Sequence, residues 1–323
     1  MGLFHIFSMK NAPFVLKVKA VFNILGIAYF TGTVSSGIFI AFFISIPKLV
    51  EVHNFSTTKH YLIALFLCIN IVGNYLLTAL TDTSTDTLQA TTCRTSPCGH
   101  VHQKDLKDKR SSRGSRQSAS SGKRRINHKS WDKSKLRQGA LSNTNTLTKP
   151  WRAYDCILCR SCILKRDHHC FFVGSCIGYH NQKYFIQCCA YLACGCCYSI
   201  ILTSLYLHTR YGTQFQGAWT FIYLLPLTVI SWLQGSTPLG EICLVLFLYI
   251  ALVGGVVGIG FCLWESHITF LGLTTYEAMH GLTGPKKGSF KDNFCDVFGK
   301  YWYIGMLIPI RLPQYGNGTY GQY

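Results

Sequence analysis

Residues 155–176 read DCILCRSCILKRDHHCFFVGSC, and this stretch determines how the rest of the chain is interpreted. Cys156 and Cys159 have the C-x-x-C spacing at which two thiolates bind one zinc ion. A tetrahedral site needs two more ligands, and the candidates follow in the same stretch: His168, His169, Cys170 and Cys176. In a reducing cytosol these thiols are not expected to form disulfides. The pattern therefore predicts a structural zinc site.

One zinc site cannot use all of these candidates, and the surplus points to a second chemistry. Cys170 follows Asp167 and His168, which gives a thiol, a base and an acid that orients the base. A neighbouring histidine promotes the thiolate, and a carboxylate on its other ring nitrogen fixes the tautomer. Spacing alone leaves two readings of Cys170, a nucleophile or a zinc ligand.

The composition indicates a membrane protein. Of 323 residues, 49% are apolar and 14% are charged, where soluble domains carry about a quarter charged residues. The mean hydropathy is +0.21, and the 31 Lys and Arg exceed the 13 Asp and Glu by 18. These figures argue against a disordered chain and against an ordinary cytosolic enzyme.

Four apolar stretches are long enough to cross the bilayer as helices: Ala20–Ile46, Tyr61–Leu80, Phe185–Leu207 and Leu239–Trp264. Their one acidic residue is Glu241, at the edge of the fourth stretch. A fifth stretch, Ala218–Gly235, contains Pro226 and is expected to be a re-entrant or interfacial lumenal segment. The fold class is therefore an all-α integral membrane protein with a cytosolic zinc domain between spans 2 and 3.

Basic residues predict the orientation. The loop from Thr81 to Tyr184 holds 20 Lys and Arg against 7 acids, a net charge of +13. The positive-inside rule puts this loop and both tails in the cytosol. Residues 104–137 are basic and polar, and we expect them to be disordered. The segment is either a solvated linker or is attracted to anionic lipid, and both readings are favoured over nucleic-acid binding.

Three motifs resemble the DHHC family of protein S-acyltransferases. The first is Asp167-His168-His169-Cys170 between the second and third spans. Thr274-Thr275-Tyr276-Glu277 matches the family's Thr-Thr-x-Glu motif, and Asn293-Phe-Cys-Asp-Val-Phe-Gly299 matches its C-terminal motif. The resemblance covers the chain except residues 99–150 and the last dozen residues.

The resemblance implies a role for each matched position. Cys170 would take a fatty acyl group, with palmitoyl the expected one, from acyl-CoA as a thioester and pass it to a cysteine of a membrane-associated substrate protein. His168 would be the base, oriented by Asp167. In the family pattern, His169 would complete a zinc site with Cys156, Cys159 and Cys176. Thr275 would lie near Asp167, and Phe172 would lie near the acyl chain. Asn293 would hold the tail against the membrane core.

The chain also departs from the family pattern. Asp155 stands where members carry the histidine of an additional zinc site, although Cys162 is present. The upstream candidates for that site are Cys93 and Cys98, separated from it by the basic insert. We therefore expect this second site to be weakened, rewired or lost. Phe171-Phe172 replaces the usual Pro-Trp after the nucleophile.

The expected organisation has six parts: a cytosolic tail (1–19), two spans with a short lumenal loop (20–80), a basic cytosolic insert (81–150), a Cys-rich zinc domain (151–184), two further spans (185–264) and a cytosolic tail with the last two motifs (265–323). The resemblance implies an ER or Golgi location, with the plasma membrane as an alternative. Rival hypotheses are a catalytically inactive zinc-bearing adaptor and a channel or transporter. The spans hold no charge to mark an ion path apart from Glu241, which argues against a channel.

Overall fold

The computed structural model describes residues 12–47, 56–85, 152–211, 219–282 and 289–314. The basic segment 104–137 and the candidate ligands Cys93 and Cys98 lie outside these residues. Four helices in the described part are long and apolar enough to cross a membrane: Leu16–Ser45, Thr57–Leu80, Gln182–His208 and Leu239–Phe270. The prediction of four spans is confirmed, and each helix extends beyond the apolar run that predicted it.

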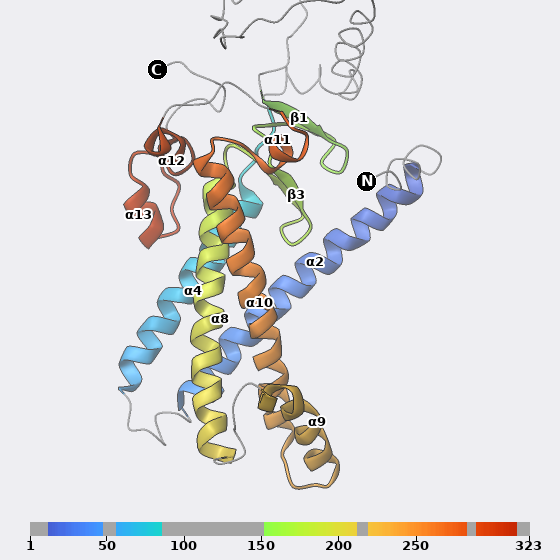
Figure 1. Cartoon of the computed structure of the whole chain (residues 1–323), viewed down its shortest axis with the longest axis vertical. Helices are drawn as coiled ribbons and strands as arrows, with labels where there is room; N and C mark the ends of the chain where they lie inside the picture. Colours follow the sequence, from blue (N-terminus) through green and yellow to red (C-terminus); the bar gives the residue numbers. More distant parts are fainter. Residues whose placement is uncertain (1–11, 48–55, 86–151, 212–218, 283–288, 315–323) are drawn as a thin grey trace, which may run out of the picture.

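The first span comprises α2 (Ala12–Ile40) and a π-helical turn, η1 (Ala41–Ser45), and the second is α4 (Thr57–Leu80). The third is α8 (Gln182–Tyr211) and the fourth is α10 (Leu239–Phe270). Figure 1 shows α8 and α10 side by side along the long axis, with α4 beside α8 and α2 crossing the bundle obliquely.

The α8–α10 pair forms the centre of the bundle. Gly258 lets the two helices approach closely, because an added Cβ would lie 3.2 Å from the carbonyl oxygen of Cys189. Leu207, Leu244, Val245 and Leu248 are buried in the main apolar cluster farther along the same pair.

The predicted fifth segment forms a separate short helix, α9 (Trp219–Leu233), which contains Pro226. Its 15 residues span about 22 Å, which is less than the roughly 30 Å of a bilayer core. Leu224 packs into the same apolar cluster as α8 and α10. The helix lies at the end of the bundle opposite the Cys-rich domain (Figure 1).

The Cys-rich domain is built from two hairpins. Strand β1 (Ala153–Cys156) pairs antiparallel with β2 (Ser161–Leu164), and β3 (His168–Cys170) pairs with β4 (Ser175–Ile177). The segment that follows α4 adds a short extension to the first hairpin, since Ser84 bridges to Ile163 and the N–H of Thr85 donates to the carbonyl of Cys162 at 2.9 Å.

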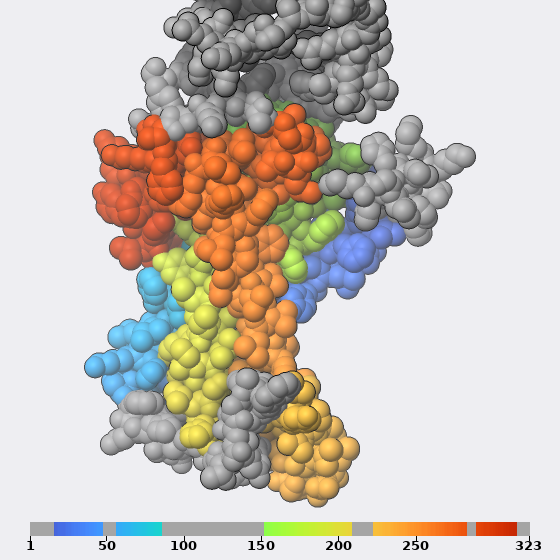
Figure 2. Space-filling model, in the orientation of Figure 1, coloured from blue at the N-terminus to red at the C-terminus, as the bar shows by residue number. Residues whose placement is uncertain are grey.

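Three short helices follow the last span at the same end of the molecule: α11 (Thr275–Met279), α12 (Phe290–Phe298) and α13 (Trp302–Leu307). Together with the hairpins they form a head that is wider than the bundle below it (Figure 2). A hydrogen bond from Lys165 Nζ to Asp296 Oδ2, at 2.9 Å between two buried side chains, joins β2's end to α12.

Candidate active site and metal centre

Three cysteines and one histidine converge between the two hairpins. Cys156 ends β1, Cys159 lies in the turn that follows, and His169 and Cys176 face each other across the β3–β4 register. The Nδ1 atom of His169 lies 3.6 Å from the Sγ of Cys156, 3.3 Å from that of Cys159 and 3.7 Å from that of Cys176. The four ligand atoms all lie within 4.8 Å of one another.

This Cys₃His cluster fits zinc. Tetrahedral bonds of about 2.3 Å to sulfur and 2.0–2.1 Å to nitrogen place sulfur and nitrogen ligands about 3.6 Å apart. The pKa of the Cys156 thiol is lowered by hydrogen bonds with Cys159 and then Cys176, which outweigh its burial. The pKa values of the Cys159 and Cys176 thiols are raised, above all by their hydrogen bonds with Cys156. Zinc binds thiolates, so a cation in the cluster would have to stabilise the two thiols that do not ionise readily.

A side chain from the first span orients the histidine of this cluster. The Nε2 of His169 lies 3.1 Å from the Oδ1 of Asn23 in α2. Such a contact outside the ligand shell fixes the tautomer that leaves Nδ1 to the metal. Asn23 was not among the residues predicted from the sequence, where its signal is a lone amide in an apolar span.

Asp167 and His168 form the second cluster, immediately before the cluster ligand His169. The Nδ1 of His168 lies 2.7 Å from the Oδ2 of Asp167, and Asp167 is only 1% exposed. Burial opposes ionisation of Asp167, but the hydrogen bond and charge of His168 outweigh it, so the pKa of Asp167 is lowered.

The pKa of His168 is shifted in the complementary direction. Burial would lower it, but the hydrogen bond to Asp167 and then the one to Cys170 raise it to about 10. His168 is therefore protonated at neutral pH and can stabilise a thiolate on Cys170. Cys170 itself is 4% exposed and ends β3, where it pairs with Ser175.

The first turn of α11 brings the Thr-Thr-x-Glu motif to the other oxygen of Asp167. The backbone N–H of Thr275 donates to Oδ1 of Asp167 at 2.5 Å. Thr274 and Glu277 form a capping box that starts this helix. Arg152 fixes the helix from the hairpin side, donating to Glu277 through Nε at 2.6 Å and to the carbonyl of Gly272 at 3.1 Å.

Cys170 belongs to a small apolar cluster that opens onto a cavity. It packs with Val173, Phe185 and Cys189, and these three residues line a cavity of about 1020 Å³ between the spans. Phe172 also lines this cavity, and its carbonyl accepts a hydrogen bond from the Tyr75 hydroxyl at 3.1 Å. The lining is almost entirely apolar, from all four spans.

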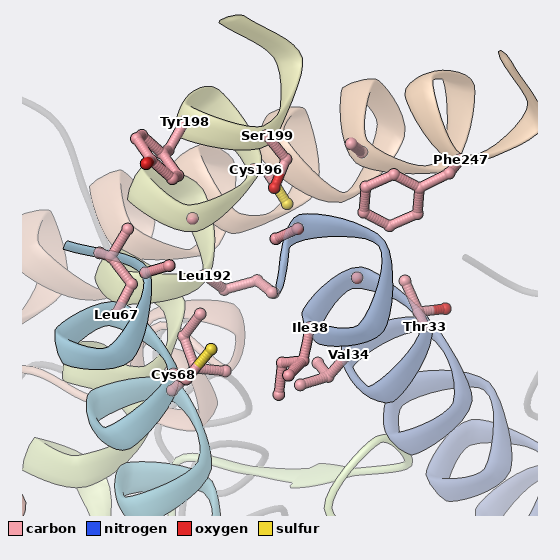
Figure 3. A pocket seen from close by; sticks show the side chains of 16 residues that line it. Thr33, Val34, Ile38, Leu67, Cys68, Leu192, Cys196, Tyr198, Ser199 and Phe247 are labelled. Atoms are coloured by element: carbon pink, nitrogen blue, oxygen red, sulfur yellow. The ribbon is translucent and has the colours of Figure 1, made fainter. Parts of the chain in front are cut away.

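A second cavity, of about 590 Å³, continues from the first along α2, α4 and α8. The two share four lining residues: Thr33, Val34, Leu192 and Cys196. Figure 3 shows the second cavity, with Leu192 and Cys196 of α8 facing Val34 and Ile38 of α2 across it.

Asn293 lies apart from the Asp167 cluster and ties α12 to the end of α10. Its Nδ2 donates to the carbonyl of Phe270 at 2.8 Å. Gly272, at a φ of 69°, leaves room for this amide, because an added Cβ would lie 2.9 Å from Asn293 Oδ1. Any other residue at position 272 would clash with Asn293, and it would also be strained because this positive φ favours glycine.

The expectation that only Glu241 is acidic in the spans is wrong, because α10 continues past Trp264 to Phe270 and includes Glu265. Glu265 is 1% exposed, and its Oε1 lies 3.8 Å from Nδ1 of His168. The apolar run ends at Trp264, but helical hydrogen bonding does not. An acidic residue inside a membrane-spanning helix is itself a signal of a functional position, and this signal would have identified Glu265.

Asp155 and Cys162 are partners across the β1–β2 register, and Cys162 is fully buried. Among the described residues, neither belongs to a group of His, Cys, Asp or Glu side chains close enough to hold a metal. The proposed second zinc site also involves Cys93 and Cys98, which lie outside the described residues.

The fold and the site together define a multi-pass membrane protein with a Cys₃His cluster that fits zinc and an Asp-His-Cys cluster beside an apolar cavity. Residues 138–281 match the family model for the DHHC palmitoyltransferase domain. This match covers 144 of the 323 residues, and over this region the chain is similar to the DHHC palmitoyltransferase family.

Named relatives are similar over a comparable part of the chain. The chain is 36% identical over 168 residues to palmitoyltransferase ZDHHC22 of Danio rerio, covering 52% of this chain and 61% of the relative. The human ZDHHC22 is 30% identical over 173 residues, covering 54% and 65%. Palmitoyltransferase pfa3 of Emericella nidulans is 29% identical over 183 residues, covering 52% and 30%. The matched region thus spans less than two thirds of each of these relatives.

Proposed function

We propose that this protein is a protein S-acyltransferase that moves a fatty acyl group, palmitoyl in the first instance, from acyl-CoA to substrate cysteines through an acyl-Cys170 intermediate. The observation that carries the proposal is the placement of Asp167, His168 and Cys170 beside the large apolar cavity. The relatives' names, palmitoyltransferases in each case, support the same activity.

In the first half-reaction, the proton of Cys170 has already passed to His168, which is the protonated ring described above. Because Nδ1 of His168 is bound to Asp167, Nε2 is the nitrogen left to exchange a proton with the thiol. The thiolate attacks the thioester carbonyl of acyl-CoA, a new C–S bond forms, and the bond to the CoA sulfur breaks. The departing CoA thiolate takes the proton back from His168, which leaves acyl-Cys170 and CoA.

The second half-reaction repeats these steps with an acceptor cysteine. His168, left neutral by the first half-reaction, takes the proton of the acceptor thiol. The acceptor sulfur then attacks acyl-Cys170, and the Cys170 thiolate leaves beside the protonated His168 ring. Both half-reactions exchange one thioester for another, so catalysis needs nucleophile activation and positioning more than energy input. Asp167 keeps its charge and position through hydrogen bonds to His168 and to the N–H of Thr275.

The cavity beside Cys170 is proposed to hold the acyl chain. Along α8 its lining residues run from Phe185 to Cys196, a distance of about 16 Å. One leaflet of a bilayer core is about 15 Å thick, so the cavity matches the length of an ordinary membrane fatty acyl chain. Phe172 lines it next to the nucleophile.

Zinc is proposed to be structural. One ion would be held by Cys156, Cys159, His169 and Cys176 and would thereby join the two hairpins. Residues Asp167 to Cys170 lie between the zinc ligands of the first hairpin and Cys176, so the ion would fix their position. The zinc site would take no part in proton transfer. Asn293 would keep the tail on the end of α10.

The proposed orientation puts the Cys-rich domain and both tails in the cytosol, where acyl-CoA is available. The partners would be membrane-associated substrate proteins, with the basic segment 104–137 adding attraction to anionic lipid and no role in binding nucleic acid. An ER or Golgi membrane is the proposed location, and the plasma membrane is the alternative. Fluorescence microscopy of the tagged full chain with organelle markers tests the location.

Incubation of the purified protein with labelled palmitoyl-CoA tests the activity. The expected result is a label that hydroxylamine removes from the wild type and that a Cys170→Ser variant does not acquire. Equal incorporation into both proteins would contradict the mechanism. A folded wild type that takes no label would favour the inactive adaptor, in which Cys170→Ser leaves partner binding unchanged while Cys156→Ser unfolds the Cys-rich domain.

A further inference from the structure

Glu265 is a buried acid in the last turns of α10, and the mechanism above does not use it. It is 1% exposed and belongs to a helix that is otherwise apolar apart from its ends. An ionisable side chain in a membrane-spanning helix is costly and rarely retained without a function.

The carboxyl group of Glu265 points toward the Asp167–His168 pair. Its Oε1 lies 3.8 Å from Nδ1 of His168, the nitrogen that also contacts Asp167. The polar atoms of Asp167, His168 and Glu265 lie within 4.8 Å of one another. Oε1 has no hydrogen-bond partner among the described residues, while Oε2 accepts from Nε2 of Gln182, in the first turn of α8, at 3.4 Å.

The other neighbours of the His168 ring on the membrane side are apolar. Phe185 of α8 meets it edge-on with ring centres 5.1 Å apart, and Phe261 of α10 lies nearly parallel at 6.4 Å. Glu265 is thus the polar side chain from α10 that reaches His168. Asp167 holds the ring from the hairpin side, so two carboxyl groups lie close to Nδ1, at 2.7 Å and 3.8 Å.

We propose that Glu265 is a positioning residue for acyl transfer: together with Gln182 it holds the imidazole of His168 in line between Asp167 and Cys170. The proposal rests on the acyltransferase function proposed above. Loss of the Glu265 carboxyl would let the ring turn toward the apolar side, away from the geometry that proton exchange with Cys170 requires. Small displacements of a catalytic group have large effects on rate.

Two substitutions separate positioning from folding. Glu265→Met replaces the carboxyl by an apolar group of similar length, which a membrane-buried position tolerates. Glu265→Gln keeps both a donor and an acceptor. The matched control is Glu241→Met, because Glu241 is also buried, at 6% exposure, in the first turn of the same helix, far from His168.

The measurement is the single-turnover rate of self-acylation at saturating palmitoyl-CoA, with the half-saturating concentration and the zinc content of each protein. We expect Glu265→Met to slow the step by about tenfold to a hundredfold, with zinc content and half-saturating concentration unchanged. Glu265→Gln should restore the rate to within a few-fold of the wild type, and Glu241→Met should match the wild type.

A wild-type rate in Glu265→Met would overturn the proposal, as would a Glu265→Gln rate as low as that of Glu265→Met. If Glu265→Met loses zinc or aggregates, the residue is structural and the proposal is wrong. A wild type that does not acylate itself at all would instead contradict the proposed function, so the two failures are distinguishable.

Discussion

Asp167 is held by two hydrogen bonds of different origin, one from the His168 ring and one from a backbone N–H of α11. The backbone bond connects the Thr-Thr-x-Glu motif to His168 through Asp167. The hydroxyl of Thr275 does something else, accepting a hydrogen bond from Nε1 of Trp264 at 2.9 Å. The main chain of Thr275 therefore holds Asp167, whereas its side chain holds Trp264, and the two contacts can be removed separately.

Thr275→Pro removes the backbone N–H without disturbing the helix. Proline is tolerated at the first position of a helix, and Thr274, at φ −108° and ψ 161°, already has the extended conformation that a residue before proline prefers. A hydrogen bond to a charged group contributes about 1.5–3 kcal/mol, so self-acylation should slow by about 10- to 100-fold. Thr275→Val, which keeps the N–H, should remain near the wild-type rate. Equal rates in the two variants would contradict this assignment.

Asn23 gives a second prediction, about metal affinity. Asn23→Leu removes the contact to Nε2 of His169 and should weaken zinc binding by about 10- to 100-fold, the usual effect of losing such a partner. Competition with a graded series of zinc chelators measures this. Ile24→Leu, at a position that is 67% exposed on the same helix, is the control and should leave the affinity unchanged.

For individual residues, the sequence predicted the contacts that depend on spacing along the chain. Cys156, Cys159, His169 and Cys176 meet because their spacing and two hairpin turns bring them together. Asn23 and Glu265 reach the same site from the first and fourth spans, far away in the sequence. No local pattern could have indicated these contacts, which depend on how the spans pack against the hairpins.

Elements near the site are joined by buried ion pairs. Arg152 and Glu277, whose side chains are 1% and 3% exposed, attach α11 to the first hairpin. Removing one partner of such a pair leaves an unpaired buried charge. The pair therefore matters for the position of Thr275 as well as for stability.

Arg152→Met should lower the free energy of unfolding by about 3–5 kcal/mol, since the Glu277 carboxylate is then buried without its partner. Adding Glu277→Gln should recover much of the loss, because the amide is neutral and can still cap α11. Thermal unfolding of the detergent-solubilised proteins measures both changes. A double variant as unstable as the single one would show that the ion pair is not the cause.

Element boundaries were predicted well where hydropathy changes at the membrane surface and poorly where it does not. The second span ends at Leu80 as expected. The fourth helix continues to Phe270 because its last turns pack against α8 and α12, and Glu265 there contacts Gln182 of α8. Hydropathy measures exposure to lipid, so it could not find that extension.

For the whole molecule, the two connected cavities set the length of the space in which the proposed acyl chain would lie. The second cavity continues along α8 to Ser199, about 5 Å beyond the end of the first. Ala64 of α4 lines it and is 3% exposed. Small side chains such as Ala64 leave this space open.

Ala64→Leu should fill part of the second cavity and leave the one beside Cys170 intact. We expect palmitoyl-CoA to label this variant at a rate near that of the wild type, whereas the longer arachidoyl-CoA should label it several-fold more slowly, since each buried methylene contributes about 0.8 kcal/mol. Leu62→Phe, at a position of the same helix that is 60% exposed, should leave the ratio of the two rates unchanged. An unchanged ratio in Ala64→Leu would show that the second cavity does not hold the chain.

The most direct test follows the acyl group from Cys170 to an acceptor. Wild-type protein is loaded with labelled palmitoyl-CoA, separated from free acyl-CoA, and mixed with a membrane-anchored peptide that carries one cysteine. We predict that mass spectrometry will locate the label on the peptide containing Cys170 at first, and that it will then move to the acceptor as Cys170 is freed. Label that stays on Cys170, or that reaches the acceptor only when acyl-CoA is still present, would contradict the two-step mechanism.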